Sequence, residues 1–304
     1  MRIGIDLGGT KIAAVVLGDG GEVVWEARVS TPRGDYDGTL NQVAALVREG
    51  DRAAGRICTV GVGIPGAVSR ATGLVKNANS TWLIGRSFGA DLEGRLSREV
   101  RLANDANCLA ISEATDGSGA GSAVVFGVIL GTGVGGGLVV HGKLVEGANG
   151  ICGEWGHNPL PWPEPSESPG ELCYCGRRGC IETWVSGPGL AADYVRAGCG
   201  KAGEGLAAEE IARRADAGDG GAIAALNRWE ARLARALVTL VNLLDPDVIV
   251  VGGGLSAIGR IYQGIPQLWG RWVFSDSVTT RIVPAKHGAA SGVRGAAWLW
   301  PWRE

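Results

Sequence analysis

The chain has 304 residues, of which 45% are hydrophobic and 20% are charged, and its formal net charge is −2. This length allows two compact lobes, and the composition is that of a soluble globular protein with no polyanion or membrane partner. The amino-terminal sequence lacks the basic and apolar regions of a secretory signal, and no apolar run is long enough to span a bilayer. We therefore expect a cytoplasmic protein whose seven cysteines are reduced thiols.

The first half of the chain predicts alternating strands and helices. Three antiparallel strands joined by glycine turns are predicted over residues 2–8, 12–18 and 22–30. They are followed by a helix over about 38–53, a strand over 57–66, a short helix ending near Arg98, a strand over 100–104 and a helix from Asp105 to about Ala114. This alternation indicates an α/β fold with a mixed sheet.

The opening pattern returns in the second half. Residues 127–147 align with residues 4–24 without a gap, and both segments read as strand, glycine turn and strand. Chance similarity between two glycine-rich segments is the alternative. A phosphate-facing hairpin at the start of each half is typical of the duplicated, actin-like ATPase (ribonuclease H-like) fold, with an interlobe cleft. We expect an amino-terminal lobe over 1–117 plus 288–304 and a carboxy-terminal lobe over 118–287.

The remainder of the second half is mainly helical. A proline-rich insertion over about 148–185, which contains a cysteine cluster, interrupts the pattern. Beyond it the sequence predicts helices over about 188–198, 206–217 and 219–243, a strand over 247–254, a helix from Ser256, a strand over 281–285 and a last helix over about 289–300. We expect the last helix to pack against the amino-terminal lobe.

Three glycine turns are candidates for contact with a nucleotide. In the first, Asp6 ends a strand, and the turn that follows has no side chains to block a phosphate, so its N–H groups can face one anion. Asp6 would face the Mg²⁺ ion that accompanies ATP, although a plain hairpin with a surface lysine is the alternative. The candidate residues of the three turns are Gly8, Gly9, Thr10 and Lys11; Gly131, Thr132 and Gly133; and Gly252, Gly253 and Gly254.

Asp105 is the candidate catalytic base. It follows a predicted strand and begins a predicted helix, so its carboxylate would point at a substrate if this strand end opens into the interlobe cleft. Transfer of a phosphoryl group to an alcohol requires alignment and a proton acceptor, and a carboxylate can be that acceptor. A helix cap is the alternative role for an aspartate in this position.

The insertion contains a candidate zinc site. Three cysteines lie within eight residues, and a histidine upstream would complete a tetrahedral structural site formed by His157, Cys173, Cys175 and Cys180. A loop of free thiols with an unrelated histidine is the alternative. Zinc would hold Glu154 and Glu182 on either side of the insertion, where both carboxylates can bind sugar hydroxyls or remain ordinary exposed glutamates. The other cysteines are predicted to be core or near-core residues: Cys58, Cys108, Cys152 and Cys199.

Together these motifs resemble the ROK family of bacterial sugar kinases and sugar-responsive repressors. They follow that family's order over nearly the whole chain: DLGGTK (6–11), GIPG (63–66), NDAN (104–107), GTG (131–133), EWGHNPL (154–160), CYCGRRGC (173–180) and VVGGG (250–254). Within the family, segments such as KNANSTW (76–82) and HGAASGVRGAAWLW (287–300) most resemble the bacterial fructokinases, also called mannofructokinases.

The resemblance implies roles for individual residues. It implies that Asp105 is the catalytic base, that Gly4 to Lys11 form the first phosphate segment, and that the histidine and cysteines named above bind structural Zn²⁺. It also implies that six residues contact the sugar, with His157 serving both zinc and sugar: Asn79, Asn104, Asp105, Glu154, His157 and Glu182.

The expected activity is transfer of the γ-phosphoryl group of Mg·ATP to the C6 hydroxyl of fructose, with mannose and glucose as further substrates. A glucokinase or an amino-sugar kinase of the same family is the alternative, because the sequence does not show which hydroxyl stereochemistry is read. A non-catalytic, sugar-responsive repressor would have a DNA-binding domain before Gly4, and we expect none. The cysteine cluster also lacks the basic and aromatic neighbours of a nucleic-acid module. Apolar faces of the helical second half fit a homodimer.

Overall fold

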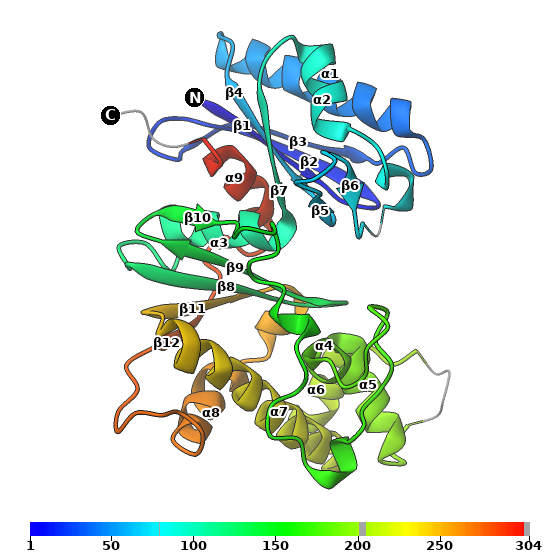
Figure 1. The fold of residues 1–304 in the computed structure, drawn as a ribbon, viewed down its shortest axis with the longest axis vertical. Helices are drawn as coiled ribbons and strands as arrows, with labels where there is room; N and C mark the ends of the chain where they lie inside the picture. The colour runs from blue at the N-terminus through cyan, green and yellow to red at the C-terminus, as the bar shows by residue number, and fades with distance from the viewer. Residues whose placement is uncertain (79, 201–204, 301–304) are drawn as a thin grey trace. The chain divides into compact units, whose positions relative to one another are not determined.

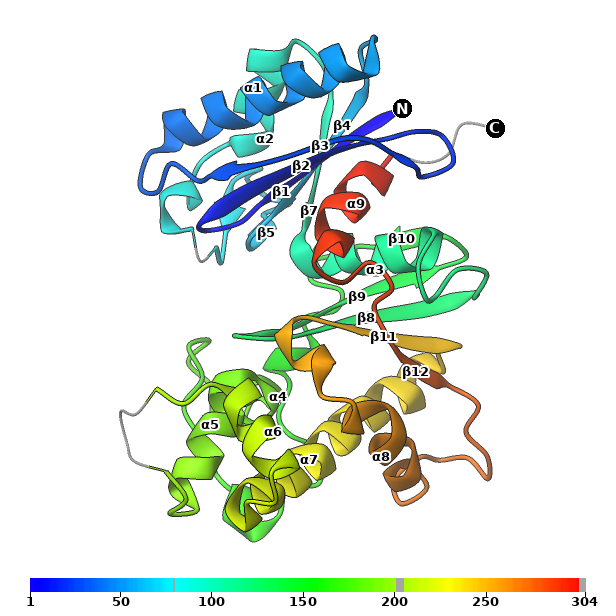
Figure 2. The same cartoon turned by 180° about the vertical axis from the view of Figure 1, so that it is seen from behind.

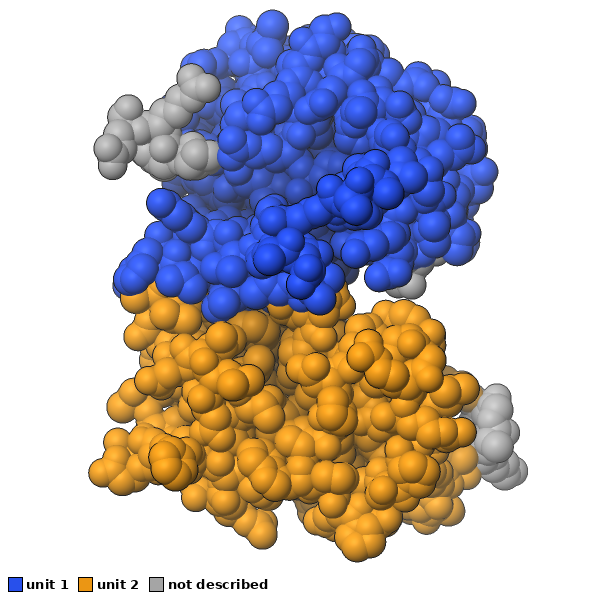
Figure 3. Space-filling view, in the orientation of Figure 1, with its two compact units in different colours: residues 1–121, 137–152, 289–304 blue, residues 122–136, 153–288 orange. Residues whose placement is uncertain are grey.

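The computed structural model describes residues 1–78, 80–200 and 205–300, which fold into two compact units (Figure 3). Unit 1 comprises residues 1–121, 137–152 and 289–304, and unit 2 comprises residues 122–136 and 153–288. Residues 137–152 thus belong to unit 1, whereas the predicted lobe boundaries assign them to the carboxy-terminal lobe. Among the described residues, no helix has both the length and the apolar character that crossing a membrane requires.

The first sheet has five strands in the order β3-β2-β1-β4-β7 (Figure 1). β1 and β2 are antiparallel, as are β2 and β3, whereas β4 pairs in parallel with both β1 and β7. The predicted meander and mixed sheet are therefore confirmed. β1 and β4 are buried along almost their whole length because helices cover both faces of this sheet. The strands are β1 (Arg2–Leu7), β2 (Lys11–Leu17), β3 (Val23–Ser30), β4 (Thr59–Ile64) and β7 (Val100–Asn104).

The second sheet repeats this arrangement in the order β10-β9-β8-β11-β12. Here β11 pairs in parallel with β8 and β12, as β4 does with its neighbours in the first sheet. The gapless sequence alignment matches Lys11–Leu17 to Val134–Val140, and these segments are β2 and β9. The predicted α/β fold with a duplicated sheet is therefore confirmed. The strands are β8 (Val124–Leu130), β9 (Val134–Val140), β10 (Lys143–Val145), β11 (Val248–Gly252) and β12 (Arg281–Pro284).

Four helices belong to unit 1: α1 (Tyr36–Ala54), α2 (Phe88–Leu96), α3 (Asp105–Thr115) and α9 (Ser291–Trp298). Figures 1 and 2 show α1 and α2 on one face of the first sheet and α9 on the other. The boundaries of α1 follow from its caps. The side chain of Asp35 accepts the N–H of Gly38, and Gly55 ends the helix in the left-handed conformation, with φ of 66°.

The last helix, α9, packs against unit 1 as predicted, and it does so at backbone distance. A Cβ atom at Gly4 in β1 would lie 2.0 Å from the carbonyl oxygen of Val293, and one at Gly61 in β4 would lie 1.9 Å from that of Ala296. Real side chains do not tolerate such contacts, so both positions require glycine. Gly4 lies within a strand and its missing side chain makes room for α9. Packing against α9 therefore explains why position 4 is a glycine, and the predicted place of Gly4 in the first phosphate segment stays a prediction.

Unit 2 contains the predicted helices of the second half except the last one, which is α9 of unit 1. The helix predicted from Ser256 begins later, at Arg260, because residues Gly254–Ala257 form a 3-10 turn. In unit 1 the sequence analysis missed a two-stranded sheet, β5 (Ala67–Val68) with β6 (Val75–Lys76), whose strands are too short to give a pattern. The helices of unit 2 are α4 (Ile181–Val185), α5 (Gly187–Arg196), α6 (Ala208–Asp216), α7 (Gly220–Leu244) and α8 (Arg260–Trp269).

Buried ion pairs attach the insertion to α7. The carboxylate of Glu167 lies 2.7 Å from Arg232 and 2.8 Å from Arg235, and Arg232 also binds Asp193 of α5 at 2.8 Å. All four side chains are at least nine-tenths buried. Removing one partner from such a network would leave a buried charge uncompensated, so these pairs fix the insertion in a single arrangement on α7.

The contact between α9 and α3 gives a stability prediction. A Cβ at Gly295 would lie 1.7 Å from the carbonyl oxygen of Cys108, so Gly295→Ala should force two helix backbones apart and lower the free energy of unfolding by about 2–3 kcal/mol. Gly94→Ala in α2 is the matched control, because a Cβ there meets no atom within 4 Å. It should raise stability by about 0.5–1 kcal/mol. Urea denaturation of both variants tests this, and equal midpoints would contradict it.

Candidate functional site

Two acidic side chains, Asp6 in β1 and Asp105 at the start of α3, lie close together in unit 1. Burial, and next the negative charge of Asp105, raise the pKa of Asp6 to about 6, while Arg28 acts in the opposite direction. Neighbouring protein groups partly desolvate the Asp105 carboxyl, which raises its pKa. The residue as a whole remains exposed to solvent. Paired carboxyls with raised pKa values are suited to accepting a proton or holding a hard cation.

The cap of α3 is Asn104 and not Asp105. The Oδ1 atom of Asn104 accepts the N–H of Asn107 at 2.7 Å, and the Oδ1 atom of Asp105 accepts the N–H of Ala106 at 2.8 Å. The capping role that was the alternative for Asp105 is thus filled by its neighbour. Because its oxygen is used by the cap, Asn104 has its amide NH₂ group left to donate to a sugar.

The first glycine turn is a tight hairpin between β1 and β2. The N–H of Gly8 donates to the carbonyl oxygen of Lys11 at 3.0 Å, and the Thr31 hydroxyl donates to Gly8 at 2.8 Å. Close to this turn lies Ser80, which the sequence analysis missed. Ser80 is only 1% exposed, its Oγ lacks a hydrogen-bond partner within the described residues, and it lies 3.7 Å from where a Cβ at Gly9 would be. Its place in the KNANSTW segment was the available signal.

The second glycine turn, in unit 2, is held by Glu182. The N–H of Gly131 donates to Gly133 at 3.0 Å, and the N–H of Val134 donates to the Oε2 atom of Glu182 at 2.8 Å. A Cβ at Gly133 would lie 2.8 Å from the same oxygen, which explains the glycine there. Glu182 is therefore anchored to the turn through one oxygen, and its other oxygen can accept a further hydrogen bond.

A cavity of about 750 Å³ in unit 2 adjoins the second turn. Gly254, from the third predicted turn, lines this cavity. In the same turn, Gly252 ends β11 and pairs with β8, and Gly253, with φ of 86°, lies against the carbonyl oxygen of Leu130. A polar turn beside an apolar wall fits a nucleoside with its phosphates, and the volume is that of a typical ligand pocket. The lining residues include Gly131, Thr132, Pro188, Val195, Leu206, Glu209 and Gly254.

The predicted zinc ligands converge in unit 2. One nitrogen of His157 and the sulfur atoms of Cys173, Cys175 and Cys180 all lie within 4.8 Å of one another. Cys173 Sγ is 3.6 Å from His157 Nδ1, and Cys175 Sγ is 3.6 Å from Cys180 Sγ. Zn–S bonds of about 2.3 Å imply tetrahedral edges of about 3.8 Å, so the spacing fits zinc. The N–H of Arg177 helps to lower the pKa of Cys175 to about 6, which favours the thiolate that a metal binds.

The zinc cluster also positions the predicted sugar residues of unit 2. His157 directs Nδ1 at Cys173, and its Nε2 lies 2.9 Å from the phenol oxygen of Tyr174. Tyr174 is 80% exposed, but partial desolvation of its phenol, and next the charges of Glu182 and Glu154, raise its pKa to about 12, so both carboxylates lie near this phenol. The structure therefore brings Glu154, His157 and Glu182 together around Tyr174, which the sequence analysis did not select. The sixth predicted contact, Asn79, lies outside the described residues.

Glycine and tryptophan attach this segment to β9. The indole N–H of Trp155 donates to the carbonyl oxygen of Gly135 at 2.9 Å, and a Cβ at Gly156 would lie 2.2 Å from that of Val134. The segment that contains Glu154 and His157 thus packs directly on the strand that follows the second turn. On its other side, α4 begins directly after Cys180 and places Glu182 on the same turn.

Loss of the metal should therefore lower the stability of the insertion and also the affinity for the sugar. Dialysis against a strong chelator should remove about one zinc per chain, lower Tm by at least about 5 °C and weaken sugar binding, because α4 and Glu182 lose their anchor. Cys175→Ser should reproduce these effects, whereas Cys199→Ser, outside the cluster, should not. Metal analysis, thermal unfolding and calorimetric sugar titration provide the measurements. An unchanged Tm and sugar affinity after complete zinc removal would contradict the structural role.

Comparison with known proteins yields relatives over the whole chain. N-acetyl-D-glucosamine kinase of Escherichia coli O127:H6 is 42% identical over 303 residues, covering 98% of this chain and 99% of the relative. The protein of the same name from Yersinia enterocolitica is 41% identical over the same coverage.

Solved structures give the same picture of the fold. The ROK hexokinase of Thermus thermophilus superposes with a TM-score of 0.85 at 30% identity, covering 97% of this chain and 96% of that one. A ROK glucokinase of Streptomyces griseus, solved with glucose and AMPPNP, gives 0.77 at 30% identity and covers 98% of both chains. The sequence model of the ROK family matches residues 2–303. The chain belongs to the ROK family.

Proposed function

We propose that this protein is an ATP-dependent amino-sugar kinase that phosphorylates the C6 hydroxyl of N-acetyl-D-glucosamine. The observation that carries the choice of sugar is the 42% identity, over 98% of the chain, to a relative with that name. The fructose interpretation of the sequence rested on short segments, whereas this similarity extends over 303 residues. We therefore favour the amino-sugar alternative over fructokinase.

The paired carboxyls of unit 1 support phosphoryl transfer. In the proposed reaction the C6 oxygen attacks the γ-phosphorus, the bond from that phosphorus to the bridging oxygen of ADP breaks, and the hydroxyl proton passes to the Asp105 carboxylate. The raised pKa of Asp105 favours this proton transfer, because a base works best when its pKa is near the working pH. Asn104 forms the cap of α3, and Asp105 uses its Oδ1 atom for the N–H of Ala106, so its other carboxylate oxygen is the one we propose as proton acceptor.

ATP is the proposed phosphoryl donor. The cavity beside Gly131 and Thr132 is large enough for a nucleoside, and the structurally similar Streptomyces griseus glucokinase was solved with an ATP analogue. Two turns are our candidates for phosphate contact: Gly131–Gly133, which adjoins this cavity in unit 2, and Gly8–Lys11, which follows Asp6 in unit 1. Asp6, held close to Asp105, has the carboxylate chemistry to hold Mg²⁺, which would neutralise charge on the phosphates when bound.

The carboxylates around Tyr174 support sugar recognition. Ionised carboxylates accept hydrogen bonds from sugar hydroxyls, and His157 Nε2 can take either role. We propose that Glu154, His157 and Glu182 bind the sugar, with zinc fixing the tautomer and orientation of His157 through Nδ1. In this arrangement a sugar hydroxyl replaces the Tyr174 phenol, which is 2.9 Å from Nε2.

Replacement of the proposed base tests the chemistry. Asp105→Asn keeps the size of the side chain but cannot accept the proton, so kcat should fall by about 10²–10⁴ while sugar affinity stays within about threefold. Asp216→Asn, the same change at an exposed position in α6, is the matched control. A coupled ADP-release assay and sugar titration separate the two effects. Near-normal kcat in Asp105→Asn would remove this residue from the mechanism.

A panel of sugars tests the substrate. N-acetyl-D-glucosamine should give a kcat/KM at least about 10² above those of glucose, mannose and fructose, because a site built for an acetamido group leaves polar groups unpaired when the group is missing. ADP release and mass analysis of the sugar phosphate are the measurements. A preference for fructose would restore the fructokinase interpretation. Tight sugar binding without ATP turnover would favour a non-catalytic regulator instead.

A further inference from the structure

A second cavity, of about 730 Å³, lies in unit 1 at the edge of the first sheet where β1, β4 and β7 begin. Asp6 and Asp105 lie at the other ends of these strands. With a rise of about 3.3 Å per residue, the strands separate this cavity from those carboxyls by roughly 13 Å. It therefore belongs to neither the proposed phosphate turns nor the proposed base.

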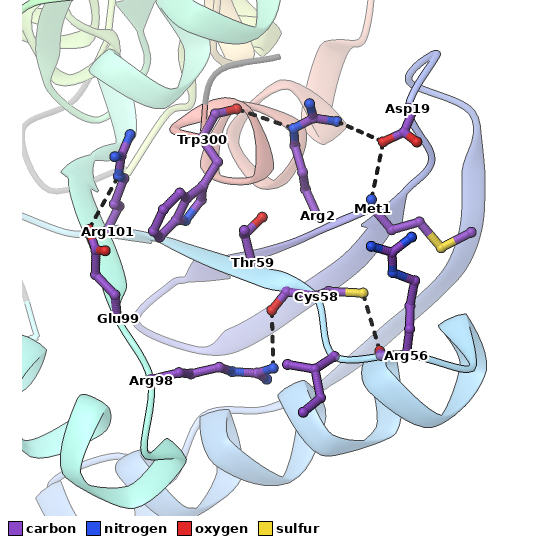
Figure 4. A pocket seen from close by; sticks show the side chains of 11 residues that line it. Met1, Arg2, Asp19, Arg56, Cys58, Thr59, Arg98, Glu99, Arg101 and Trp300 are labelled. Carbon is purple, nitrogen blue, oxygen red and sulfur yellow. Dashed lines mark hydrogen bonds and ion pairs between the residues drawn. The ribbon is translucent and has the colours of Figure 1, made fainter. Parts of the chain in front are cut away.

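Arginines from separate segments line this cavity (Figure 4). Arg2 begins β1, Arg56 follows α1, and the remaining two, Arg98 and Arg101, flank the start of β7. Two acidic residues, Asp19 and Glu99, also line it, so the lining side chains carry a net excess of positive charge. Arg2 pairs with Asp19 at 3.7 Å, Arg98 with Asp51 at 2.7 Å and Arg101 with Glu99 at 3.7 Å, which offsets part of this charge. The excess of positive charge that remains attracts an anion.

Neighbouring groups hold three of these arginines in place. Arg98 binds Asp51 at 2.7 Å and the carbonyl oxygen of Cys58 at 3.0 Å. Arg101 lies 4.0 Å over the Trp300 ring and donates to the carbonyl oxygen of Leu299 at 2.8 Å. Arg2 is only 5% exposed and donates to the carbonyl oxygen of Trp300 at 3.2 Å. These side chains are therefore preorganised and would lose little conformational entropy on binding a ligand.

Two polar atoms at this cavity await a partner. The hydroxyl of Thr59 and the Nε atom of Arg98 are buried and have no hydrogen-bond partner within the described residues. Figure 4 shows Thr59 between the arginine side chains. Leaving buried donors unpaired costs about 1–3 kcal/mol each. Both atoms are covered by the protein, so an oxyanion pairs with them only after a small shift of the neighbouring side chains.

We propose that this cavity is a binding site for a phosphate dianion, either free or as the monoester of a small polar molecule. Each guanidinium group can form two parallel hydrogen bonds to a phosphate, and several guanidinium groups can bind one phosphate dianion. The volume exceeds what one phosphate fills, and Trp300 and the exposed side chain of Ile57 add apolar walls against which a sugar ring can pack. Arg56, an exposed residue on the rim, closes the site over the anion.

Binding at this cavity would also act on α9. Because Arg2 and Arg101 hold the carbonyl oxygens of Trp300 and Leu299, an anion that binds these arginines fastens the end of α9 to β1 and β7. The ligand would then raise the stability of unit 1 in proportion to its occupancy. This proposal is independent of the identity of the sugar that the kinase uses.

Calorimetric titration with inorganic phosphate and with glucose 6-phosphate, at low and high salt, tests the site. Arg56→Gln should weaken binding at this cavity about tenfold, the loss of one charge-assisted hydrogen bond, and Arg56→Lys should restore part of it. Arg52→Gln, an exposed arginine on the last turn of α1 that does not line the cavity, is the matched control. Phosphate bound at the kinase site is unaffected by either change, so the contrast between the variants isolates this cavity.

The two ligands distinguish the source of the phosphate. Tighter binding of glucose 6-phosphate identifies an ester site, and equal or tighter binding of inorganic phosphate identifies the free anion. Identical titrations of Arg56→Gln and Arg52→Gln with both ligands would overturn the proposal. In phosphate-free buffer, kinase turnover of Arg56→Gln should match that of Arg52→Gln, so failure of this inference leaves the kinase assignment untouched.

Discussion

The architecture of unit 1 depends on the close backbone packing of α9. Glycines at positions 4, 61 and 295 let this helix contact β1, β4 and α3 at distances that no side chain permits. Its start lies by Asp6, since a Cβ at Gly292 would be 3.3 Å from the Asp6 carboxylate, and the residues after it bind arginines at the opposite sheet edge. One short helix thus spans the distance between the paired carboxyls and the arginine-lined cavity. Because close-packed elements have low compressibility, a small displacement at one end of α9 is transmitted to its other end.

In unit 2 the corresponding constraint is the cluster of His157 with three cysteines. The chain enters it through the segment of Trp155 and Gly156, which packs on β9, and leaves it through α4, which places Glu182 on the turn before β9. Both segments therefore end on the same hairpin. The buried ion pairs between Glu167 and the arginines of α7 hold a part of the insertion that is not among the metal ligands. Removing either support would leave the carboxylates attached to the backbone but no longer aligned.

Sequence reasoning succeeded where the signal is local. The strands, the duplicated hairpin and the long helices follow from hydrophobic period and glycine turns, and the zinc ligands follow from cysteine spacing. It failed where the reason for a residue lies in tertiary contact. Gly4 was predicted within a phosphate segment, and only the packing of α9, nearly three hundred residues later, explains why a glycine stands there. Ser80 and Tyr174 lie within segments that the sequence analysis quoted, but only the groups around them in the structure single them out.

The preference for one sugar is the property that local sequence patterns predict least well. In the proposed mechanism, Asp105 and the phosphate turns act on the C6 hydroxyl and on ATP, which do not differ between hexose substrates. Discrimination depends on which polar atoms of the site remain unpaired when one substituent of the sugar is absent. Short segments that resemble fructokinases and a full-length similarity to N-acetyl-D-glucosamine kinases can therefore coexist in one chain. The full-length similarity weighs more, because the groups that hold Glu154 and Glu182 come from the insertion, the second turn and β9 and are not contained in any one motif.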